Sequence, residues 1–90
     1  MAFRRSDECT LPRRRLTLLH LATCASGTDL TPYDLARLSR GRFSRKTIVR
    51  EIQRGKLAAD IDRRGRTVVH WIEFKEARRY FILRGLIASA

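Results

Sequence analysis

The sequence predicts an α+β domain in which three to four helices accompany a two-stranded β-hairpin. Two short segments, residues 31–40 and 44–54, each begin with a helix-capping residue, and a turn that contains Gly41 separates them. After Leu57 the apolar residues change from helical spacing to the alternation of a strand. Helical spacing returns in residues 74–86, which predicts a last helix.

An N-terminal helix is expected to begin at Pro12, because proline suits the first position of a helix, and to end before Gly27. Its apolar face is expected to belong to the core: Leu16, Leu18, Leu19, Leu21 and Ala22. Arginines before this stretch give it a loose likeness to a secretion signal, but His20 interrupts the apolar run, so we assign it to the domain. We expect residues 1–10 to be a flexible N-terminus, 11–84 a single domain and 85–90 a C-terminal tail.

The next two helices are expected to form a helix-turn-helix. In the first, Thr31 is the N-cap, Pro32 the first helical residue and Asp34 the partner in a capping box, and the helix ends near Gly41. Its inward residues are Leu35, Ala36 and Leu38. The second runs from about 45 to 54, between an N-cap at Ser44 and a terminating glycine at position 55. This order of cap, helix, tight turn, cap and helix is typical of helix-turn-helix motifs.

The second of these helices has two different faces. One face is apolar and is expected to point into the domain: Ile48, Val49 and Ile52. The other face is basic and polar, with Glu51 and Thr47 at its borders. Its side chains are of the types that read base edges and bind phosphates, and the helix N-terminus can itself bind a phosphate. The candidate DNA-binding residues are Ser44, Arg45, Lys46, Thr47, Arg50, Gln53 and Arg54.

The hairpin is expected to pair residues 57–62 with residues 67–73 through a turn at 63–66. On the second strand, one face carries Val68, His70 and Ile72, and the other carries Val69 and Trp71. Gly65 supplies the turn, so three arginines are expected at the hairpin tip as a second DNA contact: Arg63, Arg64 and Arg66.

Charge is the strongest indication of the partner. The chain has 20 Lys and Arg against 9 Asp and Glu, a formal net charge of +11, which predicts a polyanionic partner such as nucleic acid or an anionic membrane surface. Arginine outnumbers lysine by 17 to 3. A GC-rich genome also favours arginine, but it does not explain the net charge. Since no apolar run is long enough to span a membrane, we expect double-stranded DNA and no membrane.

No catalytic or metal site is predicted. Two cysteines, Cys9 and Cys24, are too few for a disulfide framework, and no zinc-ligand spacing exists. His70 is expected to be a strand residue, and Tyr33 and Tyr80 are expected to pack in the core. No set of nucleophile, base and orienting residue can be built from the serines and histidines. We therefore expect a protein that is not an enzyme and needs no cofactor or metal.

Residues 30–83 resemble the winged-helix domain shared by phage excisionases and MerR-type regulators. The likeness lies in the order "LTPYDLARL", "SRKTIVREIQRGKL", a hairpin with "RRGR", and "WIEFKEARRYF". The turn "SRGRF" is longer than the compact turn of the regulators, and the N-terminal helix is an addition. MerR-type regulators continue into a long dimerisation helix, which does not fit after Phe81. The resemblance is therefore to excisionases, also called recombination directionality factors.

This resemblance implies a function. Such proteins bind and bend attachment-site DNA and help a separately encoded tyrosine or serine integrase to excise a mobile element. They associate cooperatively head to tail on DNA, in the cytoplasm with the nucleoid. One alternative is a small winged-helix transcriptional regulator. Another, from a different class, is an interaction or toxin–antitoxin module whose basic face binds an acidic protein.

The apolar C-terminal segment also leaves two interpretations open. The segment "FILRGLIASA" gathers five large apolar residues at the end of the domain: Phe81, Ile82, Leu83, Leu86 and Ile87. A helix that is apolar on most sides must be covered. Either the N-terminal helix covers it within one chain, through Leu16 and Leu19, or it docks on a neighbouring protomer or on the integrase.

Overall fold

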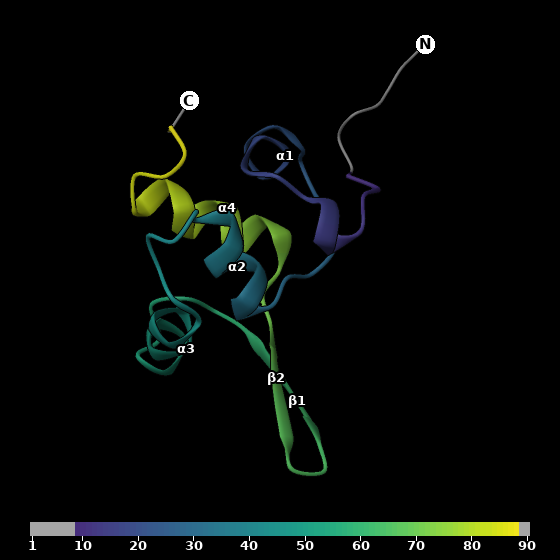
Figure 1. Cartoon of the computed structure of the whole chain (residues 1–90), viewed down its shortest axis with the longest axis vertical. Helices are drawn as coiled ribbons and strands as arrows, with labels where there is room; N and C mark the ends of the chain where they lie inside the picture. The colour runs from purple at the N-terminus through teal and green to yellow at the C-terminus, as the bar shows by residue number, and fades with distance from the viewer. Residues whose placement is uncertain (1–8, 89–90) are drawn as a thin grey trace.

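The computed structural model describes residues 9–88, which form four α-helices and a two-stranded antiparallel hairpin. In chain order the elements are a 3-10 turn (Arg13–Arg15), α1 (Leu18–Thr23), α2 (Pro32–Leu38), α3 (Arg45–Gln53), β1 (Asp60–Arg64), β2 (Thr67–Trp71) and α4 (Phe74–Leu83). The hairpin projects from the helical body like a wing (Figure 1). The α+β, winged-helix-like prediction is confirmed. Residues 1–8 of the predicted N-terminus and 89–90 of the predicted tail lie outside the described residues.

The N-terminal helix was predicted too long. Instead of one helix from Pro12, the chain makes a single 3-10 turn, and α1 begins only at Leu18. The cause is a capping box: the hydroxyl of Thr17 accepts a hydrogen bond from the backbone N–H of His20 (3.4 Å), and the Thr17 N–H donates to the His20 ring (3.2 Å). A threonine that caps a helix has an extended backbone, so the helix cannot run through it.

This break changes which apolar residues reach the core. Leu16, which precedes α1, is fully buried, whereas Leu19 on α1 is 69% exposed. The helix ends at Thr23, four residues before the glycine that was expected to end it. The prediction that Leu16 lies in the core is confirmed, and the same prediction for Leu19 is wrong.

The capping signals of α2 and α3 are confirmed. The Thr31 hydroxyl accepts from the Asp34 N–H (3.3 Å), and the Asp34 carboxylate accepts from the Thr31 N–H (2.9 Å). At the start of α3 the Ser44 hydroxyl accepts from the Thr47 N–H (3.2 Å). Helix α3 ends at Gln53, and Arg54 is its C-cap. The next residue, Gly55, has a φ of +77°, which glycine adopts readily.

The longer turn between these helices is closed by a buried serine. α2 ends at Leu38, earlier than predicted, and Ser39 follows it. The Ser39 hydroxyl donates to the Ala36 carbonyl (2.7 Å) and accepts from the Phe43 N–H (3.1 Å). A side chain therefore satisfies backbone groups that a shorter turn would pair directly.

The hairpin begins and turns later than predicted. Strand β1 starts at Asp60 rather than at Leu57, which is buried in the core, and it continues through Arg64, which pairs with Thr67. Only Gly65 and one further residue form the turn, because a glycine at φ +60° permits a two-residue connection. Arg63 and Arg64 therefore lie on the strand, and Arg66 alone of the three is in the turn.

A separate backbone pair attaches the hairpin to the helical body. Ile72, one residue after β2, forms an isolated antiparallel bridge with Leu30, the residue before the cap of α2. Their two N–H···O distances are 2.7 and 2.8 Å, and both side chains are fully buried. Ile72 therefore belongs to the core and not to a face of the strand. The bridge fixes the position at which the hairpin joins the helical body.

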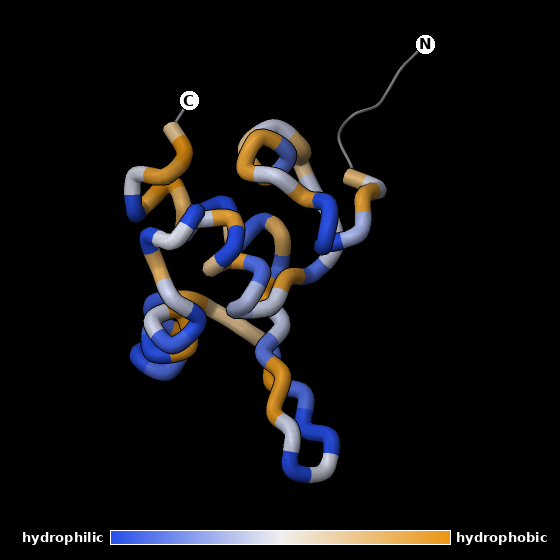
Figure 2. Tube along the Cα trace, in the orientation of Figure 1, coloured by the Kyte–Doolittle hydropathy of each residue, from blue (hydrophilic) through white to orange (hydrophobic). Residues whose placement is uncertain are grey.

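The core lies between the helices, around α4. Its predicted stripe of Phe74, Ala77 and Phe81 is buried, as is Tyr80, which confirms these packing predictions. Figure 2 shows the hydrophobic residues gathered in the helical body, whereas much of α3 and the tip of the hairpin are hydrophilic. The remaining buried apolar residues are Cys9, Leu16, Leu21, Leu30, Leu35, Leu38, Ile48, Leu57, Ile72 and Ile87.

Part of the C-terminal segment completes this core. The N–H groups of Leu86 and Ile87 both donate to the Phe81 carbonyl (2.9 and 3.3 Å), so the chain turns back after α4 at Gly85. Ile87 is buried as a result, while Leu83 stays exposed. Phe81 and Ile87 are thus covered within one chain, but Leu19, which was expected to help cover this segment, is exposed.

Substitution of Gly27 by alanine is expected to destabilise the fold. A Cβ at this position would lie 2.5 and 2.7 Å from two ring carbons of Phe74, and that ring is buried under the guanidinium group of Arg78. Overpacking of this kind costs about 1–3 kcal/mol of unfolding free energy, which urea denaturation would measure. In a Phe74→Leu background the clash is relieved and Gly27→Ala should cost much less. An equal loss in both backgrounds would contradict this account.

Candidate nucleic-acid interface

An open groove of about 690 Å³ lies between α3, the N-terminal end of α2 and strand β2. Figure 1 shows α3 and the hairpin at the same end of the molecule. The lining residues are Thr31, Pro32 and Tyr33 from α2 and its cap, Arg45, Lys46, Val49, Arg50 and Gln53 from α3, and Thr67, Val68, Val69 and His70 from β2. Three of them are cationic and none is a carboxylate, so the groove favours an anionic ligand.

Four of the predicted α3 residues form one wall of this groove: Arg45, Lys46, Arg50 and Gln53. All four are exposed, and helical spacing aligns the last three along the same face. Val49 was predicted to point into the domain, but it is only half-buried and lines the groove beside them. The wall therefore combines positive charge with an apolar strip at its base.

The other three predicted α3 residues lie outside the groove. Arg54 is exposed at the C-terminal end of the helix. Ser44 caps the start of the helix by accepting a hydrogen bond from the Thr47 N–H, and the hydroxyls of Ser44 and Thr47 lie 3.1 Å apart. Both hydroxyls are thus partly satisfied within the chain.

The wing arginines lie at the far end of the hairpin. Arg63, Arg64 and Arg66 are all exposed, and none of them lines the groove. Arg64 donates to Asp62 on the same strand (3.1 Å), an exposed pair that contributes little to stability. The structure therefore has two separate cationic surfaces, one on α3 and one at the hairpin tip.

Glu51 was predicted to border the exposed face of α3, but it is 6% exposed and belongs to the core. Its carboxylate accepts a hydrogen bond from the Tyr80 hydroxyl (3.2 Å) and lies 3.5 Å from Nη1 of Arg84. Burial and the nearby negative charge of Glu51 raise the pKa of Tyr80 above its usual value. The only acidic residue of α3 is thereby turned away from the basic face.

Tyr33 was predicted to pack in the core, but it is 65% exposed at the N-terminal end of α2 and lines the groove. The helical period already indicates that Tyr33 lies off the inward face of α2. Pro32, Leu35 and Ala36 are spaced to share the inward face, and a residue one position after Pro32 lies about 100° away from it. Tyr80, in contrast, is buried as predicted.

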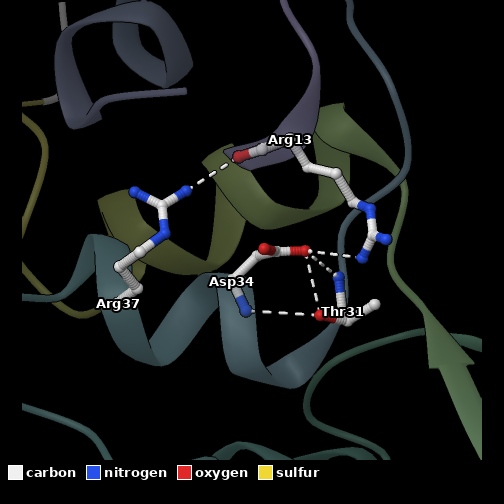
Figure 3. Close-up of polar contacts among 4 residues, drawn as sticks. All are labelled: Arg13, Thr31, Asp34 and Arg37. Atoms are coloured by element: carbon white, nitrogen blue, oxygen red, sulfur yellow. Dashed lines mark hydrogen bonds and ion pairs between the residues drawn. The ribbon is translucent and has the colours of Figure 1, made fainter. Parts of the chain in front are cut away.

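The segment before α1 contacts both α2 and the hairpin. Nη1 of Arg13 lies 3.4 Å from the Asp34 carboxylate, and its guanidinium group lies 5.2 Å from the ring of Trp71 on β2. Arg37 of α2 in turn donates to the carbonyls of Arg13 (2.8 Å) and Leu16 (3.1 Å). Figure 3 shows Arg13 reaching Asp34 beside the Thr31 cap and Arg37 reaching the Arg13 carbonyl. These contacts attach both α2 and the base of the hairpin to the segment that precedes α1.

A second polar cluster ties α4 to the loop after α3. Two nitrogens of Arg79 donate to the two oxygens of Glu76 (2.8 and 2.7 Å), and the Ala58 N–H donates to the same carboxylate (2.8 Å). The hydrogen bonds from Arg79 lower the pKa of Glu76, and the Ala58 N–H adds to this effect. This carboxylate stabilises the loop that leads from α3 into the hairpin.

Cys9 and Cys24 are free thiols, and Cys9 is buried. Cys24 is half-buried, and burial together with the neighbouring Cys9 thiol raises its pKa. A nucleophilic cysteine needs the opposite shift. Within residues 9–88 no three His, Cys, Asp or Glu side chains gather where a metal ion could bind.

No protein-family model matches this chain, and no significant match was found among curated proteins or solved structures. Of the helices between residues 9 and 88, none has the length and apolar character needed to cross a membrane. Functional conclusions therefore depend on the residues and geometry described above.

Glu51→Ala is expected to weaken the fold without changing the exposed basic face of α3. The substitution leaves the buried Tyr80 hydroxyl without its acceptor, which costs about 1–3 kcal/mol in the free energy of unfolding. Arg54→Ala on the exposed end of the same helix is the control and should change stability by less than about 0.5 kcal/mol. Chemical denaturation would measure both. Equal stabilities of the two variants would show that the Glu51 contacts add nothing.

Proposed function

We propose that this protein is a DNA-binding excisionase, which binds and bends attachment-site DNA and assists an integrase encoded elsewhere. The observation that carries the DNA-binding part is the cationic groove wall of α3, free of carboxylates, beside a hairpin whose tip carries arginines. The recombination part is supported by the resemblance of residues 30–83 to excisionases and by their strongly basic composition. In this proposal the protein has no catalytic activity, and the integrase performs all strand cleavage.

The proposed binding mode assigns one groove of the DNA to each of the two cationic surfaces. Helix α3 enters the major groove with its exposed Lys46, Arg50 and Gln53 toward the bases. The hairpin tip then lies beside a neighbouring minor groove, where narrow width and strong negative potential attract arginine. Because Glu51 is buried, no acidic side chain of α3 opposes the approach of phosphates.

The recombination assignment has a direct test. Purified protein, the element's integrase and a plasmid carrying both attachment sites should give excision only when all three are present. Footprinting on the same sites should show protection at adjacent repeats, because the proposed protein associates head to tail on DNA in the nucleoid. Binding confined to a promoter, with no effect on excision, would identify a transcriptional regulator instead.

Binding to duplex DNA is expected to depend strongly on salt. With about five to eight phosphates neutralised, log Kobs against log[salt] should have a slope near −5 to −7. Replacing Arg63, Arg64 and Arg66 with glutamine should weaken binding to all sequences. The same replacement should reduce the magnitude of that slope by about one for each phosphate that the hairpin no longer neutralises.

A variant with the same net charge controls for this effect. Arg14, Arg15 and Lys75 are exposed and lie outside the groove and the hairpin, so their replacement with glutamine should change the slope much less. Equal effects of the two triple variants would mean that the hairpin tip has no specific role.

Sequence choice is expected to depend on Lys46, Arg50 and Gln53. Each substitution by alanine should weaken binding to the specific site by about 1–3 kcal/mol and to random DNA by much less. Fluorescence anisotropy with the two duplexes would measure this difference, and Lys75→Ala serves as the control on α4. A residue whose substitution affects both duplexes equally contacts a phosphate rather than a base.

A further inference from the structure

Two of the large apolar side chains that stay exposed in residues 9–88 lie on opposite walls of the groove. Tyr33 stands at the N-terminal end of α2, and Val68 stands on β2. Val49 of α3 and Val69 of β2, both half-buried, also line the groove. Apolar side chains that gather around one hollow are a feature of ligand-binding grooves.

The groove also has the charge of an anion-binding site. Arg45, Lys46 and Arg50 form its α3 wall, and no carboxylate lines it. A ligand that fits must therefore present both negative charge and an apolar surface. One sugar–phosphate strand of a duplex has this alternation, because each charged phosphate is followed by a largely apolar deoxyribose.

Tyr33 is rigidly placed for such a contact. The Thr31 and Asp34 capping box fixes the start of α2, Arg13 braces the Asp34 carboxylate, and Pro32 beside Tyr33 is buried. In residues 9–88 the Tyr33 hydroxyl makes no hydrogen bond that would have to be broken on binding.

We propose that the groove between α3 and β2 holds one sugar–phosphate strand of the DNA, and that Tyr33 donates its hydroxyl hydrogen bond to a phosphate of that strand. The Tyr33 ring and Val68 then cover the sugars from the two sides. This inference rests on the proposed DNA-binding function and adds a contact that has no base specificity, whose role is to set the position of α3 in the major groove.

The test uses the full-length protein with three single substitutions. Tyr33→Phe removes only the hydroxyl, Tyr33→Ala also removes the ring, and Leu83→Ala removes an exposed apolar residue of α4 outside the groove. Because Tyr33 is exposed, the first two variants should fold normally, which circular dichroism and thermal unfolding would check. Binding is measured on the specific duplex and on a random duplex at the same salt concentration.

We expect Tyr33→Phe to weaken binding to both duplexes by about tenfold and Tyr33→Ala by more, because each removes a hydrogen bond to a charged group. Leu83→Ala should bind as the unmodified protein does. Ethylation interference gives the second readout: the unmodified protein should be sensitive to a set of ethylated phosphates, and Tyr33→Phe should lose sensitivity at one of them.

The failures of the two proposals are distinguishable. If the unmodified protein does not bind duplex DNA, the proposed function itself is wrong. If it binds, and the Tyr33 variants keep the same affinity and the same interference pattern, the function stands and the groove contact is wrong. A loss of affinity confined to the specific duplex would also overturn the inference, because Tyr33 would then contact a base.

Discussion

The Asp34 carboxylate is the contact on which the arrangement of α2, the N-terminal segment and the base of the hairpin depends. It is buried and accepts from the N–H and hydroxyl of Thr31 (both 2.9 Å), and Arg13 lies beside it. Arg13 also lies over Trp71 at the base of the hairpin. A buried carboxylate is tolerated only when its oxygens are paired, so this residue holds the cap of α2 and the N-terminal segment in one fixed geometry. The Leu30–Ile72 bridge beside it then directs the wing.

The same pairing of carboxylates produces the charge distribution of the surface. Of the seven Asp and Glu residues between 9 and 88, four lie in ion pairs with arginines of the same chain: Asp34, Glu51, Asp62 and Glu76. The other three are exposed but do not line the groove. The groove is thereby left without a carboxylate in its lining, although exposed cations such as Arg14, Arg15 and Lys75 also lie elsewhere on the surface. Fields from grouped like charges speed the encounter with a polyanion.

Much of the helical part of the fold was predictable because its signals are local. Thr31 with Asp34, Ser44, and Gly55 each act on backbone groups within a few residues, so tertiary contacts are not needed to interpret them. The stripe of Phe74, Ala77 and Phe81 is likewise set by helical spacing alone. The Thr17 capping box was also local but was overlooked, because the apolar residues on both sides of it fit one continuous helix. The basic face of α3 was predicted in the same way, and its role in DNA binding stays a prediction.

What only the tertiary structure decided are the contacts between residues far apart in the chain. Glu51 has the sequence signature of an exposed helix residue, but Tyr80 and Arg84 of α4 draw it into the core. Leu57 alternates like a strand residue, yet the core takes it out of the hairpin, and Gly27 is required only because Phe74 lies against it. The groove exists only because β2 stands opposite α3. Local sequence determined each helix and its charged face, whereas the distances between elements depend on packing across the chain, which periodicity does not encode.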